Sequence, residues 1–220
     1  MTVVLAPLAV HGGPQGAGRP PTAAMSRRLV ADPDAMEAVH RALAEHTEAD
    51  EYRSGRPGPP VVLEVFAYCR FAARQFVERC DDAVRRLRPA DSVALEPVAL
   101  LQQFTVRTGW TGPCYATSAP AAGGATALGL GLGLVESGRV ASAYVCEVLR
   151  DDETGAFWAL ATRLRPHPAG TDELVDASPE APAGVPPDVW ARSALAGARR
   201  EQRSARADRP ERLSAAPPLR

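Results

Sequence analysis

The 220-residue sequence has no lysine, so arginine supplies all of its fixed positive charge. Aromatic residues make up only 5% of the chain, whereas alanine, proline and glycine are abundant, a bias typical of a GC-rich genome and uninformative about function. The formal net charge is −1, which excludes a general electrostatic attraction to nucleic acid or to an anionic membrane.

The sequence also has no Cys-x-x-Cys pair among its four cysteines, and its four histidines are scattered. This spacing indicates neither a zinc site nor a disulfide framework. We therefore expect Cys69, Cys80, Cys114 and Cys146 to be free thiols in a reducing compartment, with no metal or other cofactor.

A signal peptide and a membrane span are both disfavoured. No basic residue precedes the apolar N-terminal run, and no small-residue cleavage pattern follows it, so we expect a cytoplasmic protein. Residues 115–135 are long enough to cross a bilayer but are rich in small and hydroxylated residues and contain Pro120, which favours a buried segment.

Length and composition predict one domain followed by a tail. A hydrophobic content of 45% over 220 residues suffices for a single core. From Arg165 the chain turns to Pro, Ala, acidic and then Arg-rich sequence, so we place the domain at 1–165 and a partly disordered tail at 166–220. Residues 195–220 carry seven Arg against three acidic residues, which fits either a solvated tail or a docking tail.

Hydrophobic periodicity predicts an α/β fold in which strands and helices alternate. Asp32 followed by Pro33 indicates a helix start, Pro89 ends a long amphipathic helix, and residues 151–155 form the turn of a hairpin. We expect strands at 3–10, 61–65, 112–119, 140–149 and 156–164, and helices at 33–46, 66–87, 97–109 and from the turn after residue 119 to 137.

Gly112-Pro113 and the segment that follows, to residue 148, resemble the central motif of ketosynthases of the thiolase superfamily. In that family Gly-Pro precedes a strand, a sharp turn and a buried helix. Residues 94–113 and 59–68 resemble the helix and the strand that come before this motif. The resemblance covers residues 1–165 and implies a thiolase-like mixed sheet with packed helices, limited to the N-terminal half of the fold.

The resemblance places Ala121 where the family carries its nucleophilic cysteine, in a pattern like Thr-Ala-Cys-Ala-Ser-Gly. Acyl transfer needs a thiolate, and a methyl group cannot attack a thioester. Cys114 lies seven residues earlier at the start of a strand, and Ser118 has no recognisable base beside it in sequence. We therefore expect no catalytic residue in this chain.

The resemblance also implies that the C-terminal half, which supplies two active-site histidines in ketosynthases, is absent. The one histidine after the turn, His167, lies in a proline-rich segment without a His-Gly-Thr motif. Some nucleophile-less relatives carry Gln at the cysteine position and are linked to decarboxylation, but Ala121 has no amide for that role. Condensation by this chain alone is therefore not expected.

These features resemble a chain-length factor, the inactive subunit that pairs with an active ketosynthase in type II polyketide or polyene assembly. The implied assembly is a heterodimer, or a dimer of heterodimers. In that family a helix of the inactive subunit lines the acyl tunnel, and the match by position is 66–87. Its tunnel-lining candidates are Cys69, Ala72 and Phe76, with Phe76 as a stop; ordinary core packing is the alternative.

Arg70 and Arg74, one helical turn apart, are candidates for docking an acidic acyl carrier protein, and a solvated helix face is the alternative. With no second sheet, the helix after the turn would expose an apolar face unless the tail or a partner covers it. Two rival functions stay open: half of a split β-ketoacyl synthase or acyltransferase, and a scaffold that recruits acyl carrier protein.

Overall fold

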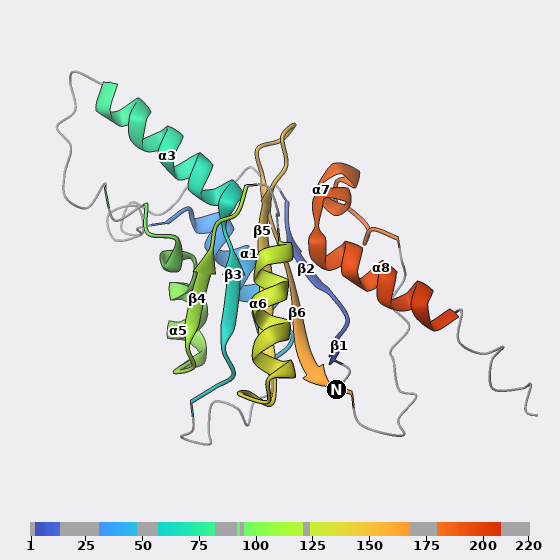
Figure 1. Ribbon diagram of the computed structural model, residues 1–220. Helices are drawn as coiled ribbons and strands as arrows, with labels where there is room; N and C mark the ends of the chain where they lie inside the picture. The colour runs from blue at the N-terminus through green and yellow to red at the C-terminus, as the bar shows by residue number, and fades with distance from the viewer. Residues whose placement is uncertain are drawn as a thin grey trace, which may run out of the picture.

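The computed structural model describes residues 3–13, 31–47, 57–81, 92, 95–120, 124–167 and 180–207, which form one mixed six-stranded sheet with helices on both faces (Figure 1). The expected α/β class is thereby confirmed. The strand order is β1 (Val3–Leu5), β6 (Phe157–Pro166), β5 (Ala143–Arg150), β3 (Val61–Glu64) and β4 (Cys114–Thr117), while β2 (Ala9–Gly12) also pairs with β6.

The pairing directions divide the sheet into two parts. β3 runs parallel to both β4 and β5, so the three strands present their carboxyl ends toward the same edge. β5 and β6 form an antiparallel hairpin, as expected from the turn at 151–155, and β6 also pairs antiparallel with β1 and β2. The parallel part is where the turn before the glycine-rich helix lies.

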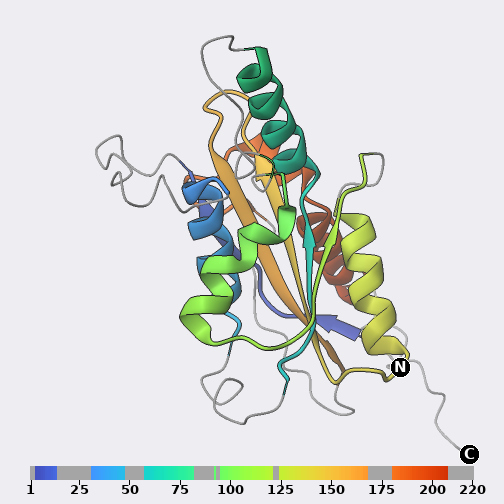
Figure 2. The same ribbon diagram turned by 90° about the vertical axis from the view of Figure 1, so that its left-hand side faces the viewer.

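Helices cover both faces of the sheet, which Figure 2 shows nearly edge-on. On one face lie α1 (Pro33–Ala44), the 3₁₀ helix η1 (Pro97–Leu101) and α5 (Gln102–Thr108). On the other lie α6 (Ala125–Glu136), α7 (Pro187–Arg192) and α8 (Ala194–Ala207). The alternation of side chains along β3 follows this arrangement, because Val61 and Leu63 join the core under α1 whereas Val62 joins the core under α6.

The start of α1 shows how local sequence sets an element boundary. The Asp32 carboxylate accepts hydrogen bonds from the backbone N–H groups of Asp34 and Ala35, both at 3.0 Å, and Pro33 occupies the first helical position. The Tyr68 hydroxyl accepts a hydrogen bond from the Asp32 N–H at 3.3 Å. The predicted Asp-Pro helix start is confirmed, and it is tied to the helix that follows β3.

That helix, α3 (Phe66–Asp81), projects from the body of the protein (Figures 1 and 2). Only Tyr68 and Ala72 among its residues are buried. The expected helix extended to Leu87, but residues 82–87 lie outside the described part of the chain. α3 is therefore anchored through its first turns, while its later turns extend beyond the core.

The segment that follows the predicted domain boundary contributes to the core. Within residues 180–207, α7 and α8 place Val189, Leu195 and Ala196 in buried positions, and α8 contacts α6 and β6. Of the two covers considered for the helix after the turn, the tail or a partner, the tail supplies part through α8. The boundary at 165 stays a prediction.

We expect Leu195→Ala to lower the free energy of unfolding by about 2–5 kcal/mol, because it empties a fully buried position in the cluster shared by α6, α8 and β6. Leu130→Ala on α6 is the matched control; Leu130 is 40% exposed, so its loss should stay below about 1 kcal/mol. Urea unfolding of both variants measures the difference. Equal small losses would show that α8 does not pack on the sheet in solution.

Candidate functional site

The candidate site lies where the parallel strands end and α6 begins. β3 ends at Glu64, β4 ends at Thr117, and Glu147 of β5 pairs in register with Glu64. We call this group of residues the elbow region and define it as Glu64, Thr117–Pro120, Gly124 and Glu147. Its expected centre, Ala121, and residues 122–123 lie outside the described part of the chain.

Glu64 is a buried carboxylate that holds the main chain of the elbow region. It is only 2% exposed and accepts hydrogen bonds from the Thr117 hydroxyl at 2.7 Å and the Ala119 N–H at 3.4 Å. It also accepts from the Phe66 N–H, at 3.1 Å, at the start of α3. One side chain thus joins the beginning of α3 to the exit of β4, and its polar atoms are satisfied despite burial.

Glu147, on the neighbouring strand, performs the same task for the C-terminal helix. Its side chain is fully buried and accepts hydrogen bonds from the Ser193 hydroxyl at 2.5 Å and the N–H groups of Ala194 and Leu195 at 2.9 and 3.2 Å. A carboxylate at the N-terminus of a helix also interacts favourably with the helix dipole. The orientation of α8 therefore depends on a side chain in the centre of the sheet.

The environment of Glu147 changes its affinity for a proton. Burial raises the pKa of Glu147, the hydrogen bonds from Ser193, Leu195 and Ala194 lower it, and the nearby charge of Glu64 raises it further. Burial is the largest of these effects, so the net shift is upward. The folded protein consequently binds a proton at Glu147 more tightly than the unfolded chain does.

Two glycines let α6 approach the sheet closely. A Cβ atom at Gly124 would lie 1.4 Å from Oε1 of Glu147, and one at Gly131 would lie 2.6 Å from a methyl carbon of Val145. No larger residue fits either position without moving its neighbours. Gly131 therefore allows this helix to pack closely on β5.

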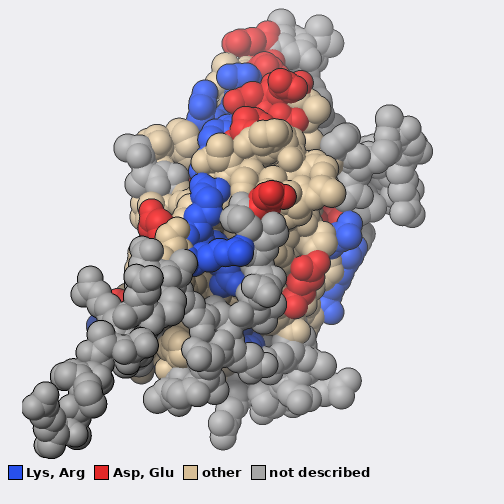
Figure 3. Space-filling view, turned by 90° about the vertical axis from the view of Figure 1, so that its right-hand side faces the viewer, with Lys and Arg blue, Asp and Glu red and all other residues tan. Residues whose placement is uncertain are grey.

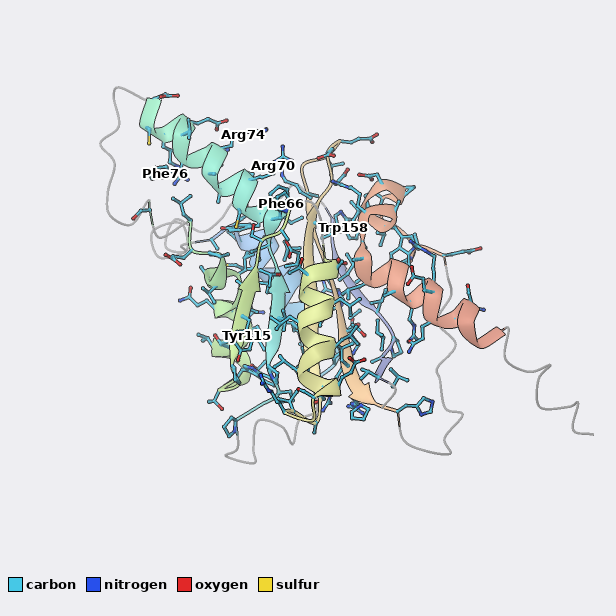
Figure 4. The ribbon with its side chains drawn as sticks, in the orientation of Figure 1. Phe66, Arg70, Arg74, Phe76, Tyr115 and Trp158 are labelled. Carbon is cyan, nitrogen blue, oxygen red and sulfur yellow. The ribbon has the colours of Figure 1, made fainter. Side chains whose placement is uncertain are left out.

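The predicted tunnel-lining residues all lie on α3, and Figure 4 shows Phe76 on the part of this helix that projects away from the strands. The Cys69 thiol shares a hydrogen bond with Ser118, so Cys69 lies at the elbow region itself. Ala72 is buried and Phe76 is half-buried, and seven residues of helix separate Cys69 from Phe76 by about 10 Å along the axis. The structure therefore brings Cys69 to the site and places Phe76 outward from it.

The thiols near the candidate site are not arranged as activated nucleophiles. Burial raises the pKa of Cys69, with the Ser118 hydrogen bond lowering it and the charge of Glu64 raising it. Burial also raises the pKa of Cys114, whose thiol donates to the Gly112 carbonyl at 3.6 Å at the opposite end of β4. A raised pKa reduces the thiolate fraction on which acyl transfer depends.

The predicted docking arginines lie on the outer surface of α3. Arg70 and Arg74 are both exposed, and Figure 4 shows them on the side of the helix away from Phe76. The Arg70 guanidinium lies over the Phe66 ring at 5.8 Å from its centroid, which orients it near the start of α3.

Sequence reasoning missed the residues that organise the site: Glu64, Glu147 and Ser193. The sequence did contain a signal for the two glutamates, because each interrupts a run of apolar residues. Such a run is typical of a strand that is covered by helices on both faces of its sheet. A charged residue at such a position is buried and needs partners. The identity of those partners was not readable, since Ser193 lies 46 residues beyond Glu147.

All four cysteines are free thiols. Across the described ranges, His, Cys, Asp and Glu nowhere gather in threes as a metal site would require. No helix in the same ranges combines the length and apolar character needed to cross a bilayer.

No known protein-family model matches the sequence, and no curated protein matches it either. Solved structures do match over part of the chain. Over that part, the chain is similar to ketosynthases. One is a ketosynthase (ApeO) in complex with its chain length factor (ApeC) from Xenorhabdus doucetiae, with 10% identity, a TM-score of 0.47, and 61% of this chain and 58% of that chain covered.

A second is the ishigamide ketosynthase/chain length factor, with 12% identity, a TM-score of 0.45, and 61% of this chain and 44% of that chain covered. A third is OleA of Xanthomonas campestris, solved with lauric acid and lauroyl-CoA, with 12% identity, a TM-score of 0.37, and 75% and 56% covered. The chain thus spans between about two fifths and three fifths of these structures.

The pKa of Glu147 is raised in the folded protein above 4.5, its ordinary value, which we take for the unfolded chain. We therefore expect the free energy of unfolding to fall as the pH rises from 4.5 through the raised pKa, because the unfolded chain loses this proton at a lower pH than the folded protein does. Glu147→Gln has no such proton, so its free energy of unfolding should vary less with pH. Urea unfolding across a pH series measures both slopes. Glu136→Gln, on the exposed side of α6, is the control and should keep the wild-type slope; identical slopes for Glu147→Gln would contradict the prediction.

Proposed function

We propose that this protein is a non-catalytic chain-length factor that pairs with an active ketosynthase and shapes its acyl tunnel in polyketide or polyene biosynthesis. The proposal assigns the chain a steric role. It rests on the position of its exposed apolar side chains, on the free edge of β4, and on the absence of an activated thiol at the described part of the elbow region.

The observation that carries the proposal is the distribution of exposed apolar side chains. In the described ranges, the large apolar residues that are exposed all lie on α3, η1, α5, β4 and α6: Val77 (56%), Val98 (44%), Val106 (74%), Tyr115 (43%) and Leu130 (40%). β4 is the last strand of the sheet, and both η1 and α6 contact it. Tyr115 lies on β4 and Val98 lies on η1, which contacts β4, so two of these side chains border the last strand of the sheet, as exposed apolar residues at a protein interface do.

The backbone of β4 supports the same surface. β4 pairs with β3 along one side, and among the described residues no strand pairs with its other side. An edge strand presents N–H and C=O groups that a second chain can bond. Tyr115 and Ala116 are exposed on this strand, directly before the elbow region, where the two subunits of the proposed complex would meet.

α3 supports a role for Phe76 in the partner's tunnel. Ala72 belongs to the core, and Cys69 packs against it, so ordinary core packing accounts for both of these residues. Phe76 packs against neither of the two core clusters formed by the described residues. A half-buried aromatic on a projecting helix is available to a partner, and its bulk suits a steric stop.

The elbow region gives little support to the rival function of a split acyltransferase. Glu64 and Glu147 each have a full set of hydrogen bonds to hydroxyl and N–H groups, so neither is placed as a free general base. The Cys69 pKa is raised, mainly by burial. The second rival function, a scaffold that recruits acyl carrier protein, is distinguished by experiment. It predicts that a substitution at Phe76 leaves the length of the product unchanged.

Co-expression with candidate ketosynthases from the same genome, and purification through a tag on this chain, tests the proposal. We expect a one-to-one complex that elongates acyl chains from malonyl carrier protein, while this chain alone is inactive. Tyr115→Asp should weaken the complex at least about tenfold, because it puts a charge on the β4 surface. Ala191→Asp, on the exposed side of α7, is the control. A monomer that turns over acyl thioesters by itself would overturn the proposal.

Phe76→Ala in the same complex should lengthen the product by at least one ketide unit, because removing the ring extends the space available to the acyl chain. Val77→Ala, at the adjacent and more exposed position, should leave the product unchanged. Mass spectrometry of the released chains reports the distribution. An intact complex with an unchanged product would favour the scaffold function.

A further inference from the structure

A guanidinium group contacts two aromatic rings at the place where α3 meets the sheet. The Cζ atom of Arg150, the last residue of β5, lies 5.1 Å from the centroid of the Phe71 ring on α3 and 5.8 Å from that of the Phe157 ring on β6. The two rings meet edge to face, with their centroids 5.1 Å apart. Both distances from the cation are typical of a cation–π interaction. We call Arg150, Phe71 and Phe157 the Arg150 cluster.

The main chain around the β5–β6 turn fixes the position of Arg150. Arg150 and Phe157 lie directly opposite each other in the hairpin, so their side chains share one face of the sheet. Gly155 has a φ of 72°, and a Cβ atom there would lie 2.7 Å from a guanidinium nitrogen of Arg150. From α7, Arg192 donates to the Arg150 carbonyl at 2.7 Å and pairs with Asp188. Figure 3 shows acidic and arginine side chains gathered at this end of the molecule.

Contacts with the rings, rather than hydrogen bonds, account for the inner part of the Arg150 side chain. In the described part of the chain its buried Nε has no hydrogen-bond partner. Burial raises the pKa of Asp32, the N-cap residue of α1, and the charge of Arg150 is among the effects that lower it. Partial burial of the Arg150 cation strengthens its attraction to the ring faces, because water competes less for the guanidinium.

α3 has few other contacts that could fix its direction. Only Tyr68 and Ala72 among its residues are buried, and the helix projects from the body of the protein (Figure 2). Phe71 is half-buried and packs against the core, whereas Phe76 does not. Phe66 and Phe76 are about 15 Å apart along the helix axis, so a rotation of about 10° about Phe66 would move Phe76 by about 2.6 Å. This displacement exceeds the length of a carbon–carbon bond, about 1.5 Å.

We propose that Arg150 is a positioning residue, which holds Phe71 and so fixes the direction of α3 and the depth at which Phe76 stops the acyl chain. This inference rests on the proposed function, because Phe76 acts as a stop only in the complex with the ketosynthase. Arg150 acts through Phe71 and α3, without contacting the acyl chain. A loosely held α3 would stop chains at several lengths, so the Arg150 cluster controls how narrow the product distribution is.

Hydrogen exchange of the full chain without a partner tests the positioning step. Arg150→Met keeps the apolar stem and removes the guanidinium, so the amides of 70–77 should exchange at least about tenfold faster. Phe71→Leu should have the same effect, Phe71→Tyr should keep the wild-type rate, and Arg150→Met/Phe71→Leu should exchange no faster than either single variant. Arg139→Met, at an exposed position after α6, is the charge-matched control. Wild-type exchange in Arg150→Met would overturn the proposal.

The ketosynthase complex tests the effect on the product, with all variants compared at equal amounts of bound ketosynthase. Arg150→Met and Phe71→Leu should each lower the fraction of the main product at least about twofold, with longer and shorter chains appearing, and Phe71→Tyr should keep the wild-type distribution. Leu195→Ala weakens the core on the other face of the sheet from α3 and should also keep this distribution. Equal broadening in Leu195→Ala would show a merely structural effect and would overturn the proposal.

Failure of this inference and failure of the proposed function give different results. A wild-type chain that forms no active complex would overturn the proposed function. An active wild-type complex whose products are unchanged by Arg150→Met would overturn the further inference alone. Faster exchange of 70–77 in Arg150→Met supports the positioning of α3 by Arg150 in either case.

Discussion

The pairing of Glu64 with Glu147 across β3 and β5 is the interaction on which the rest of the architecture depends. Each carboxylate is buried, and each is satisfied by groups from elements distant in sequence. Through them the sheet orients the start of α3, the exit of β4 and the start of α8. Gly124 is required at the same place, because Glu147 occupies the space that a side chain would need. Burying two like charges side by side is costly, so both networks must stay complete.

This arrangement holds the main chain of the described part of the elbow region in place. In the described part of the elbow region the carboxylates accept hydrogen bonds from hydroxyl and main-chain N–H groups, and the nearby thiol of Cys69 has a raised pKa. The side chains that project outward, on α3 and β4, are apolar or aromatic as well as charged. The region is thus suited to holding a shape and presenting it to another molecule, which is the basis of the steric role proposed above.

The molecule has two surfaces of opposite character at the two ends of its sheet. The β4 end exposes apolar side chains beside a free strand edge, whereas the α8 end exposes arginines on a fixed helix. The helices after residue 180 produce this division, because α8 covers part of the face of α6 and β6 and carries charge on its outer side. α8 thereby helps to bury one face of the sheet, while the β4 end exposes apolar side chains among the described residues.

The sequence by itself determined the elements whose signals are local. Asp32-Pro33 specified a helix start, the hairpin at 151–155 was readable from its turn, and alternating apolar segments indicated the α/β class. The small residues of 115–135 favoured a buried segment over a membrane span, and within this segment Ala127, Gly131 and Val135 are buried. Tertiary structure alone decided the partners of Glu64 and Glu147, the docking of α8 and the outward position of Phe76. All three features depend on which strands pair and on which helix covers each face of the sheet. Contacts between residues that are dozens of positions apart leave no periodic signal in a single sequence, so the sequence alone did not predict them.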